Sequence, residues 1–259
     1  MIRFCDFTVE DKNMTNSSYK LSFDISDMNK VAEAYDIFTK NFYTPFAHAP
    51  QYIDRERLNL KTADLIFLQK LANRDYWAGI DLPVLLTGTV RSSSTVLIIA
   101  EDPLRDECHE GIVLSSPFGV HLERCRNGRQ RIYWDVIEYL ISMDQNVYLT
   151  DVNKLWLKHK DRPKEIIPAD LSEKFSDTLL LELKYFNPRL IITYGKHAEM
   201  AMNRFPEYLV RARSFVHPAG SANKEWKKVL VSFFNNDDAR CNRENKLAFI
   251  KSKVGEVLD

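Results

Sequence analysis

The chain has 259 residues, enough for one large domain or for one domain with an extension. Lys plus Arg and Asp plus Glu each number 36, so the formal net charge is zero. This excludes a globally basic nucleic-acid binder, although a locally basic surface is still compatible with it. Apolar residues make up 45% of the chain, which predicts a substantial buried core.

The first part of the chain is expected to form an extension containing helices. Residues 1–25 have the pattern of irregular or strand-like chain, whereas residues 26–41 carry apolar side chains at helical spacing behind polar capping residues. Prolines and aromatics in residues 42–60 indicate a loop. Leucines on one side of residues 61–79 then predict a second helix.

From residue 95 the pattern changes to strands that alternate with helices. Three short apolar runs predict buried strands: TVLIIAEDP from residue 95, NVYLTDVNK from residue 146 and RLIITYG from residue 189. A fourth strand is expected at KVLVSFF, residues 228–234. Helices are predicted over residues 131–143, 170–187, 196–205 and 238–257.

This alternation implies an open, mostly parallel sheet covered on both faces. We therefore expect an α/β fold, a three-layer α/β/α sandwich with a mostly parallel four-stranded sheet, formed by residues 91–259, with residues 1–90 packed on it as an N-terminal helical extension. Ligands of such sheets sit beyond the carboxyl ends of the strands. The polar residues predicted at those ends are Glu101, Asp102, Asp151 and His217.

Several classes of protein are excluded by missing motifs. The cysteines, Cys5, Cys108, Cys125 and Cys241, have spacing that suits neither a zinc site nor an iron–sulfur cluster. No Walker loop, no G-x-G-x-x-G after a strand and no G-x-S-x-G elbow occurs. The N-terminus lacks the apolar core of a signal peptide, and no run reaches transmembrane length. We expect a cytoplasmic monomer with reduced thiols and with no metal, cofactor or membrane partner.

Four segments, in this order, resemble motifs of the uracil-DNA glycosylase superfamily. They are AEDPLRDE with the later SSPFG, VYLTDVNKLW, LLLELKYFNPRLIITYGKHA and VHPAGS, and they span roughly residues 95–235. They correspond to the acidic–proline turn with its later aromatic, the strand that ends in a base-recognising residue, the helix–Pro–strand–Gly segment and the His–Pro loop. The resemblance implies excision of a flipped base from DNA.

The resemblance also implies roles for individual residues. A glycosylase must hold a flipped base, stack on it, and stabilise positive charge on the sugar and negative charge on the departing base. Asp102 or Glu101 would position water and offset the charge of the sugar. His217 would donate a hydrogen bond to the departing base. Phe118, in SSPFG, would stack on the base.

Asp151 stands where the family keeps its base-recognising Asn. An ionised carboxylate only accepts hydrogen bonds, so it would accept from uracil N3–H and repel uracil O4. A protonated carboxyl group would suit cytosine, and an ionised one would suit a guanine-like or xanthine-like edge. Asn153 has the same strand parity and could recognise the base instead. Asp151 could also pair with Lys154 or cap a turn.

Two further features differ from the family pattern. Leu104 follows Pro103 where some branches place a Tyr that excludes thymine and others place Gly, so Leu104 could exclude bulky bases or only pack. The loop after His217 has small residues, Ala219, Gly220 and Ser221, and lacks an apolar wedge to fill the space of a flipped base. The case for a duplex substrate is correspondingly weaker.

Local basic stretches predict the contact with DNA. They run from Arg124 to Arg131, from Lys154 to Lys164 and from Arg204 to Lys228, and could equally be solvated helix faces and loops. Lys154 and Ser221 are the expected phosphate contacts. We predict a glycosylase that excises uracil or another aberrant base from DNA. The alternatives are a catalytically altered or inactive member that binds nucleic acid or a nucleobase, and a hydrolase of a free nucleoside or a small glycosidic compound.

Overall fold

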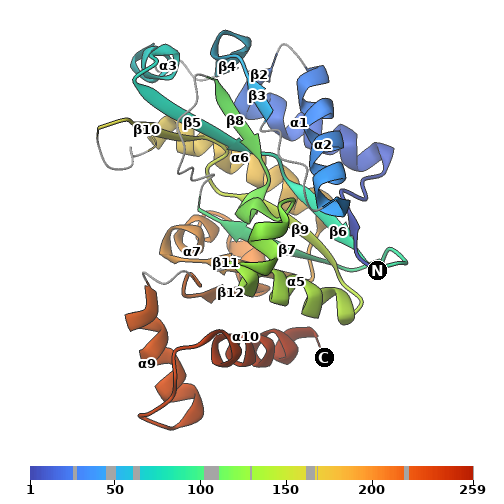
Figure 1. Ribbon diagram of the computed structural model, residues 1–259, viewed down its shortest axis with the longest axis vertical. Helices are drawn as coiled ribbons and strands as arrows, with labels where there is room; N and C mark the ends of the chain where they lie inside the picture. Colours follow the sequence, from blue (N-terminus) through green and yellow to red (C-terminus); the bar gives the residue numbers. More distant parts are fainter. Residues whose placement is uncertain are drawn as a thin grey trace.

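A mostly parallel sheet forms the centre of the protein. The computed structural model describes residues 1–25, 28–44, 51–60, 65–101, 111–128, 130–161, 167, 169–218 and 222–258. Its largest sheet has the strand order β1-β6-β9-β7-β11-β12 (Figure 1). Four neighbouring strands are parallel: β9 (Asn146–Asp151), β7 (Thr95–Ala100), β11 (Leu190–Tyr194) and β12 (Ala212–Phe215). The predicted parallel core is therefore confirmed.

The sheet has six strands and not four, because the first 90 residues contribute two more. β6 (Val84–Thr87) pairs antiparallel with β9, and β1 (Arg3–Phe4) pairs antiparallel with β6. These strands extend the sheet at one edge. The division of the chain at residue 90 stays a prediction.

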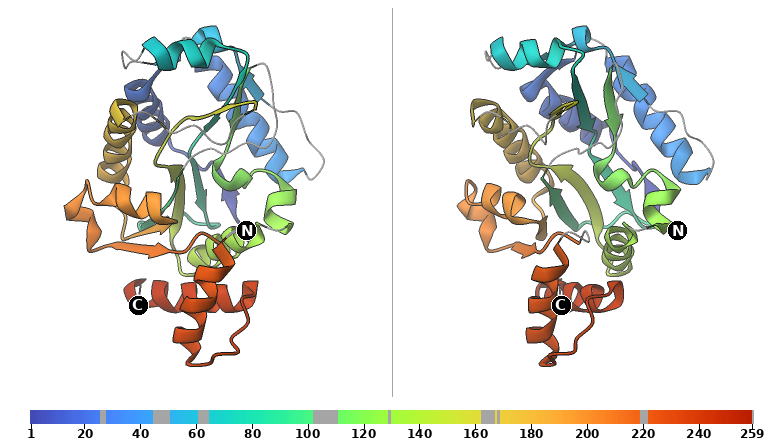
Figure 2. Two further views of the ribbon diagram at one scale, coloured as in Figure 1. Left: turned by 90° about the vertical axis from the view of Figure 1, so that its left-hand side faces the viewer. Right: turned by 60° about the vertical axis from the view of Figure 1, so that its left-hand side comes forward.

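Helices cover both faces of the sheet, as expected for an α/β/α sandwich. One face packs on α5 (Arg131–Ser142), α9 (Asn223–Phe234) and α10 (Arg243–Leu258). The other packs on α1 (Val9–Ser22), α6 (Ala169–Phe186) and α7 (Lys196–Met202). Figure 2 shows α9 and α10 at the opposite end of the molecule from α3 (Leu65–Ala72). Four of these helices, α5, α6, α7 and α10, confirm the sequence-based predictions.

The predicted fourth strand at residues 228–234 is wrong, because this segment lies in helix α9. Its buried residues Trp226 and Leu230 are four apart, which is the spacing of one helix face. The fourth parallel strand is β12, at the edge of the sheet. Its sequence, ARSF, is not a continuous apolar run, and only its last residue is buried, because an edge strand is only partly covered.

The predictions for the N-terminal part are only partly confirmed. Helix α2 (Met28–Tyr43) is present as expected, but residues 1–25 contain helix α1, which begins with a capping box between Thr8 and Asp11. The buried side of α1 is largely polar, so apolar periodicity did not reveal it. The second predicted helix is shorter, since it ends at Ala72 and is followed by a strand.

A second, smaller sheet has the order β10-β5-β8-β3. Its strands are β3 (Gln51–Ile53), β5 (Tyr76–Asp81), β8 (Ile112–Ser115) and β10 (Trp156–His159). The predicted loop over residues 42–60 is therefore wrong in part: besides β3, it contains the 3-10 turn η1 (Arg55–Arg57) and β4 (Leu58–Leu60), which pairs with β2 (Phe23–Ile25). The short elements η2 (Pro117–Gly119), α4 (Glu123–Asn127) and α8 (Pro206–Leu209) complete the described fold.

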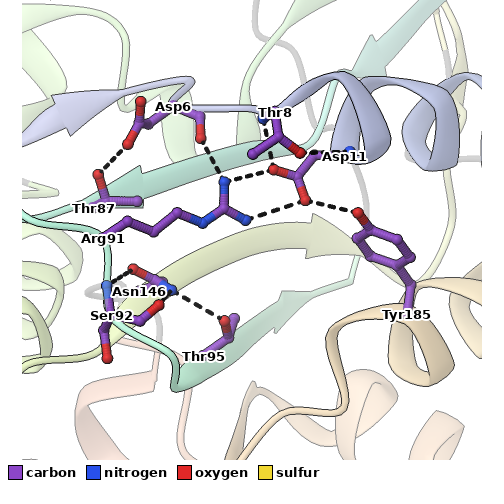
Figure 3. A network of polar contacts seen from close by, with 9 residues as sticks. All are labelled: Asp6, Thr8, Asp11, Thr87, Arg91, Ser92, Thr95, Asn146 and Tyr185. Carbon is purple, nitrogen blue, oxygen red and sulfur yellow. Dashed lines mark hydrogen bonds and ion pairs between the residues drawn. The ribbon is translucent and has the colours of Figure 1, made fainter.

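A polar network fixes helix α1 at the amino ends of the central strands (Figure 3). The Arg91 guanidinium lies 2.7 Å from Asp11 Oδ2 and donates to the Asp6 carbonyl at 3.1 Å, and the Tyr185 hydroxyl donates to Asp11 Oδ1 at 3.0 Å. Burial alone would raise the pKa of Asp11, but the bonds from Arg91, Thr8 and Tyr185 hold it below its usual value. The network joins α1, the loop before β7 and the end of α6.

A buried ion pair lies between β9 and α6. The Lys154 ammonium is 2.7 Å from Glu182 Oε2, and both side chains are at most 1% exposed. Glu182 also accepts hydrogen bonds from Tyr148 at 3.1 Å and Thr150 at 3.1 Å, and a longer one from Ser18 at 3.4 Å. The carboxylate is thus held by donors from β9, α1 and the segment after β9.

We predict that Glu182→Leu destabilises the protein by about 3–5 kcal/mol, because it leaves the Lys154 ammonium buried without its partner. Adding Lys154→Met should recover most of that loss. Urea unfolding measures both. The matched control is Glu256→Ala, which breaks the exposed Lys253–Glu256 pair and should cost less than about 1 kcal/mol. A Glu182→Leu cost no larger than the control would contradict the role of the pair.

Candidate functional site

The carboxyl ends of four parallel strands lie in a row at one rim of the sheet. Asp151 ends β9 and pairs in register with Ala100, the last residue of β7. Glu101 follows β7, and its carbonyl accepts from the Asn153 amide at 3.0 Å. Gly195 follows β11, and its amide donates to the Phe215 carbonyl of β12 at 2.9 Å. Neighbouring strands are about 4.8 Å apart, so these ends form one continuous edge.

His217, two residues beyond β12, lies against the end of β11. A Cβ on Gly195 would stand 3.8 Å from the His217 Cβ, and Gly195 has φ +87°, a conformation that glycine adopts without strain. The Tyr133 hydroxyl is 3.3 Å from His217 Nδ1 and 3.1 Å from Nε2. The His217 carbonyl accepts from Trp226 Nε1 at 3.1 Å. Both the ring and the backbone of His217 are therefore held.

The environment of His217 favours its neutral form. Burial lowers the pKa of His217 below its usual 6.5, and the nearby Glu101 carboxylate opposes part of that shift. Burial also raises the pKa of Tyr133, so its hydroxyl stays protonated and can donate to the imidazole. Glu101 follows β7 and His217 lies against the end of the neighbouring strand β11, so both groups lie at the same rim.

The Phe118 ring packs beside His217's neighbour Tyr133. The Phe118 ring stacks on Tyr133, with centroids 4.1 Å apart and planes at 17°, and meets the edge of Tyr194 at 6.0 Å. Phe118 has φ +57°, which is rare for a bulky residue. Such backbone strain persists only where the surrounding structure holds it, and it clusters at functional sites. The ring is half-buried.

Glu101 is held from the other face of the sheet. His197, on the first turn of α7, places its Nδ1 2.6 Å from Glu101 Oε1. The Glu101 side chain is 33% exposed and that of His197 is 69% exposed. The carboxylate is thus oriented by a neighbour and still in contact with solvent.

Asp151 lies on the face of the sheet on which the rings of Phe118, Tyr133 and Tyr194 pack. It shares its strand parity with Val147 and Leu149, which pack in the same core as Tyr133 and Tyr194. Asp151 is 3% exposed. Asn153, beyond the strand, is half-buried. Both candidates for base recognition therefore lie at the rim.

Comparison with known proteins decides the family. The model of the uracil DNA glycosylase superfamily matches residues 87–246, well over half of the chain. The chain belongs to the uracil DNA glycosylase superfamily. No curated protein matches it.

The superfamily match contains all four motifs recognised in the sequence and all four parallel strands of the sheet. The residues expected to act in a glycosylase therefore fall within it, among them Glu101, Phe118, Asp151 and His217. Within the described ranges, the helices include none that could span a membrane. Over the same ranges, no three His, Cys, Asp or Glu side chains gather as metal ligands.

Some predicted site residues are not placed at the site. Asp102, Pro103, Leu104 and Ser221 lie outside the described residues. Lys154, expected to contact phosphate, is 1% exposed and paired with Glu182, so the structure contradicts that prediction. In the first basic stretch, Arg126 is also used by the fold, because it donates to the Val120 and Phe42 carbonyls.

Three site residues were missed by the sequence-based reasoning. Tyr133 and Tyr194 lie in a predicted helix and a predicted strand, and a tyrosine at core spacing gives no sign of the group that its hydroxyl contacts. His197 lies two residues after Gly195, and a polar residue just after a glycine at a strand end is a signal that could have been used.

The proximity of Glu101 and His217 is directly testable. Because the Glu101 carboxylate raises the pKa of His217, we predict that Glu101→Gln lowers this pKa further. NMR titration of the histidine ring signals measures it, with His217→Gln used to assign the resonance. Glu256→Gln, an exposed carboxylate on α10, is the matched control and should leave the midpoint unchanged. An unchanged or higher pKa in Glu101→Gln would show that the two groups do not interact.

Proposed function

We propose that this protein is a DNA glycosylase that hydrolyses the N-glycosidic bond of a flipped uracil or other aberrant base. The observation that carries the proposal is that Phe118, Tyr133, His217 and Glu101 lie together at the rim of the sheet. Phe118 stacks on Tyr133, Tyr133 contacts His217, and the charge of Glu101 acts on His217. These residues come from separate segments, and their chemistry matches the separate tasks of base excision.

The proposed reaction separates charge between sugar and base. As the bond from C1′ to the base nitrogen breaks, the sugar becomes oxocarbenium-like and the base takes the electron pair. The Glu101 carboxylate, or that of Asp102, offsets the positive charge and orients a water toward C1′. The water oxygen bonds to C1′, and its proton passes to the carboxylate. The base leaves as an anion and takes up a proton, and the carboxylate gives the water proton back to solvent, so the products are the free base and an abasic site.

The neutral imidazole of His217 suits the departing base. A neutral ring has one N–H donor and one acceptor nitrogen. If the Tyr133 hydroxyl donates to one ring nitrogen, the proton resides on the other, which can then donate to the base oxygen that becomes negative. A donor held in place before reaction needs little reorganisation, and removing one typically costs about 3 kcal/mol of transition-state stabilisation.

Base recognition would fall to the residues around the aromatic group. Phe118 would stack on the base, a contact worth roughly 1–3 kcal/mol. Asp151 and Asn153 are the proposed edge-recognising residues. The buried Tyr194 hydroxyl has no hydrogen-bond partner among the described residues. Burying an unsatisfied hydroxyl costs roughly 1–3 kcal/mol, so a base that bonded to it would gain affinity.

The decisive test is an excision assay on single- and double-stranded oligonucleotides carrying uracil, hypoxanthine, xanthine or a mismatch. We predict an abasic product with at least one of them, and a rate roughly 10²–10³-fold lower for His217→Ala. Glu101→Gln and Asp102→Asn together should abolish the reaction. The matched control is His159→Ala, which removes a histidine of β10 and should retain the rate within about two-fold.

Absence of product from every substrate would contradict the proposal. Binding of an oligonucleotide or a free base without cleavage would then favour a binding module that has lost the chemistry. Cleavage of a free nucleoside, but of no oligonucleotide, would favour a nucleoside hydrolase.

A further inference from the structure

A buried lysine lies next to the loop that carries His217. Lys246, on α10, is only 6% exposed. Its ammonium donates to the Pro218 carbonyl at 3.3 Å and to Asn223 Oδ1 at 2.9 Å, and lies 5.5 Å from the centre of the Trp226 ring. Among the described residues, the acceptors of Lys246 are a peptide carbonyl and a side-chain amide oxygen, and neither is a carboxylate.

This arrangement is costly for a protein core. A buried ammonium loses its hydration, and lysines are rarely buried unless an opposite charge compensates them. Lys154 follows that rule, since Glu182 lies 2.7 Å away. Lys246 has neutral carbonyl oxygens and an aromatic face instead. An apolar side chain could fill the same volume, so packing alone does not explain a lysine there.

The contacts of Lys246 explain why a lysine occupies this buried position. Pro218 directly follows His217, and Asn223 is the first residue of α9, so the ammonium joins positions on either side of residues 219–222. An ammonium carries its donors on one atom, so a single side chain can bind both oxygens with charge-assisted bonds. Trp226 adds a bond to the His217 carbonyl.

We propose that Lys246 is a positioning residue for base excision, which ties the backbone at Pro218 to α9 and α10 and so holds the His217 imidazole where the departing base needs it. This inference rests on the proposed glycosylase function. The tie acts on the backbone of the loop, whereas Tyr133 acts on the ring of His217. The C-terminal helices thereby take part in the site without contributing a group that touches the substrate.

The test compares Lys246→Met with Lys251→Met in the full chain. Lys251 is the matched control, because it lies on the same helix with its ammonium 4.9 Å from the centre of the Tyr139 ring. Small misplacements of catalytic groups can lower rates by about 10²-fold, so Lys246→Met should lower the single-turnover excision rate by roughly that factor with oligonucleotide affinity unchanged. Lys246→Arg should restore part of the rate. Lys251→Met should stay within about two-fold of the wild type.

A second pair of variants covers the case in which Lys246→Met does not fold. Asn223→Ala removes one acceptor of the tie at an exposed position, and Trp226→Phe removes the donor to the His217 carbonyl. Each should lower the rate by about 10-fold. Unchanged rates in both, or equal losses in Lys246→Met and Lys251→Met, would overturn the inference.

Hydrogen exchange separates this inference from the proposed function. Lys246→Met and Asn223→Ala should speed amide exchange in the peptide that contains His217, whereas Lys251→Met should not. An inactive wild type with this pattern would overturn the glycosylase proposal and support the tie. Unchanged exchange in an active enzyme would overturn the tie and leave the glycosylase proposal standing.

Discussion

The parallel order of β9, β7, β11 and β12 is the constraint on which the rest of the structure depends. Parallel strands present their carboxyl ends at the same edge, so residues separated by more than 100 positions, such as Glu101 and His217, lie at one rim. β9, β7 and β11 are buried on both faces, and two helical layers hold them. A change in strand order would separate the carboxylate from the imidazole while leaving every motif intact.

The two buried lysines near this rim, Lys154 and Lys246, are stabilised in two different ways. Lys154 is compensated by Glu182, and the pair joins the segment after β9 to α6 without reaching the surface. Lys246 is satisfied by neutral oxygens next to the His217 loop. The first arrangement contributes to the stability of the fold, whereas the second is explained by what it holds in place. Burial lowers the pKa of His217, which favours its neutral form.

The sequence alone predicted the parts of the fold that have a simple periodic pattern. The runs from residues 95, 146 and 189 are apolar and end in polar residues, and the parallel core followed from them. The superfamily followed from the four motifs, which lie at strand ends and in loops such as VHPAGS. Helix α1 was missed because its buried face carries Asp11, Thr15 and Ser18. β12 was missed because an edge strand needs no apolar run. The roles of Tyr133 and Lys246 depend on contacts between residues 23 to 84 positions apart in the chain, which no local pattern encodes.

The central claim is that Glu101, Phe118 and His217 act on one nucleotide. A crystal structure with an oligonucleotide that carries an uncleavable nucleotide analogue tests it most directly. The account predicts the base stacked on Phe118, with an oxygen within hydrogen-bond distance of His217 and the sugar C1′ facing Glu101. A flipped nucleotide bound elsewhere, or one that contacts none of these side chains, would contradict it.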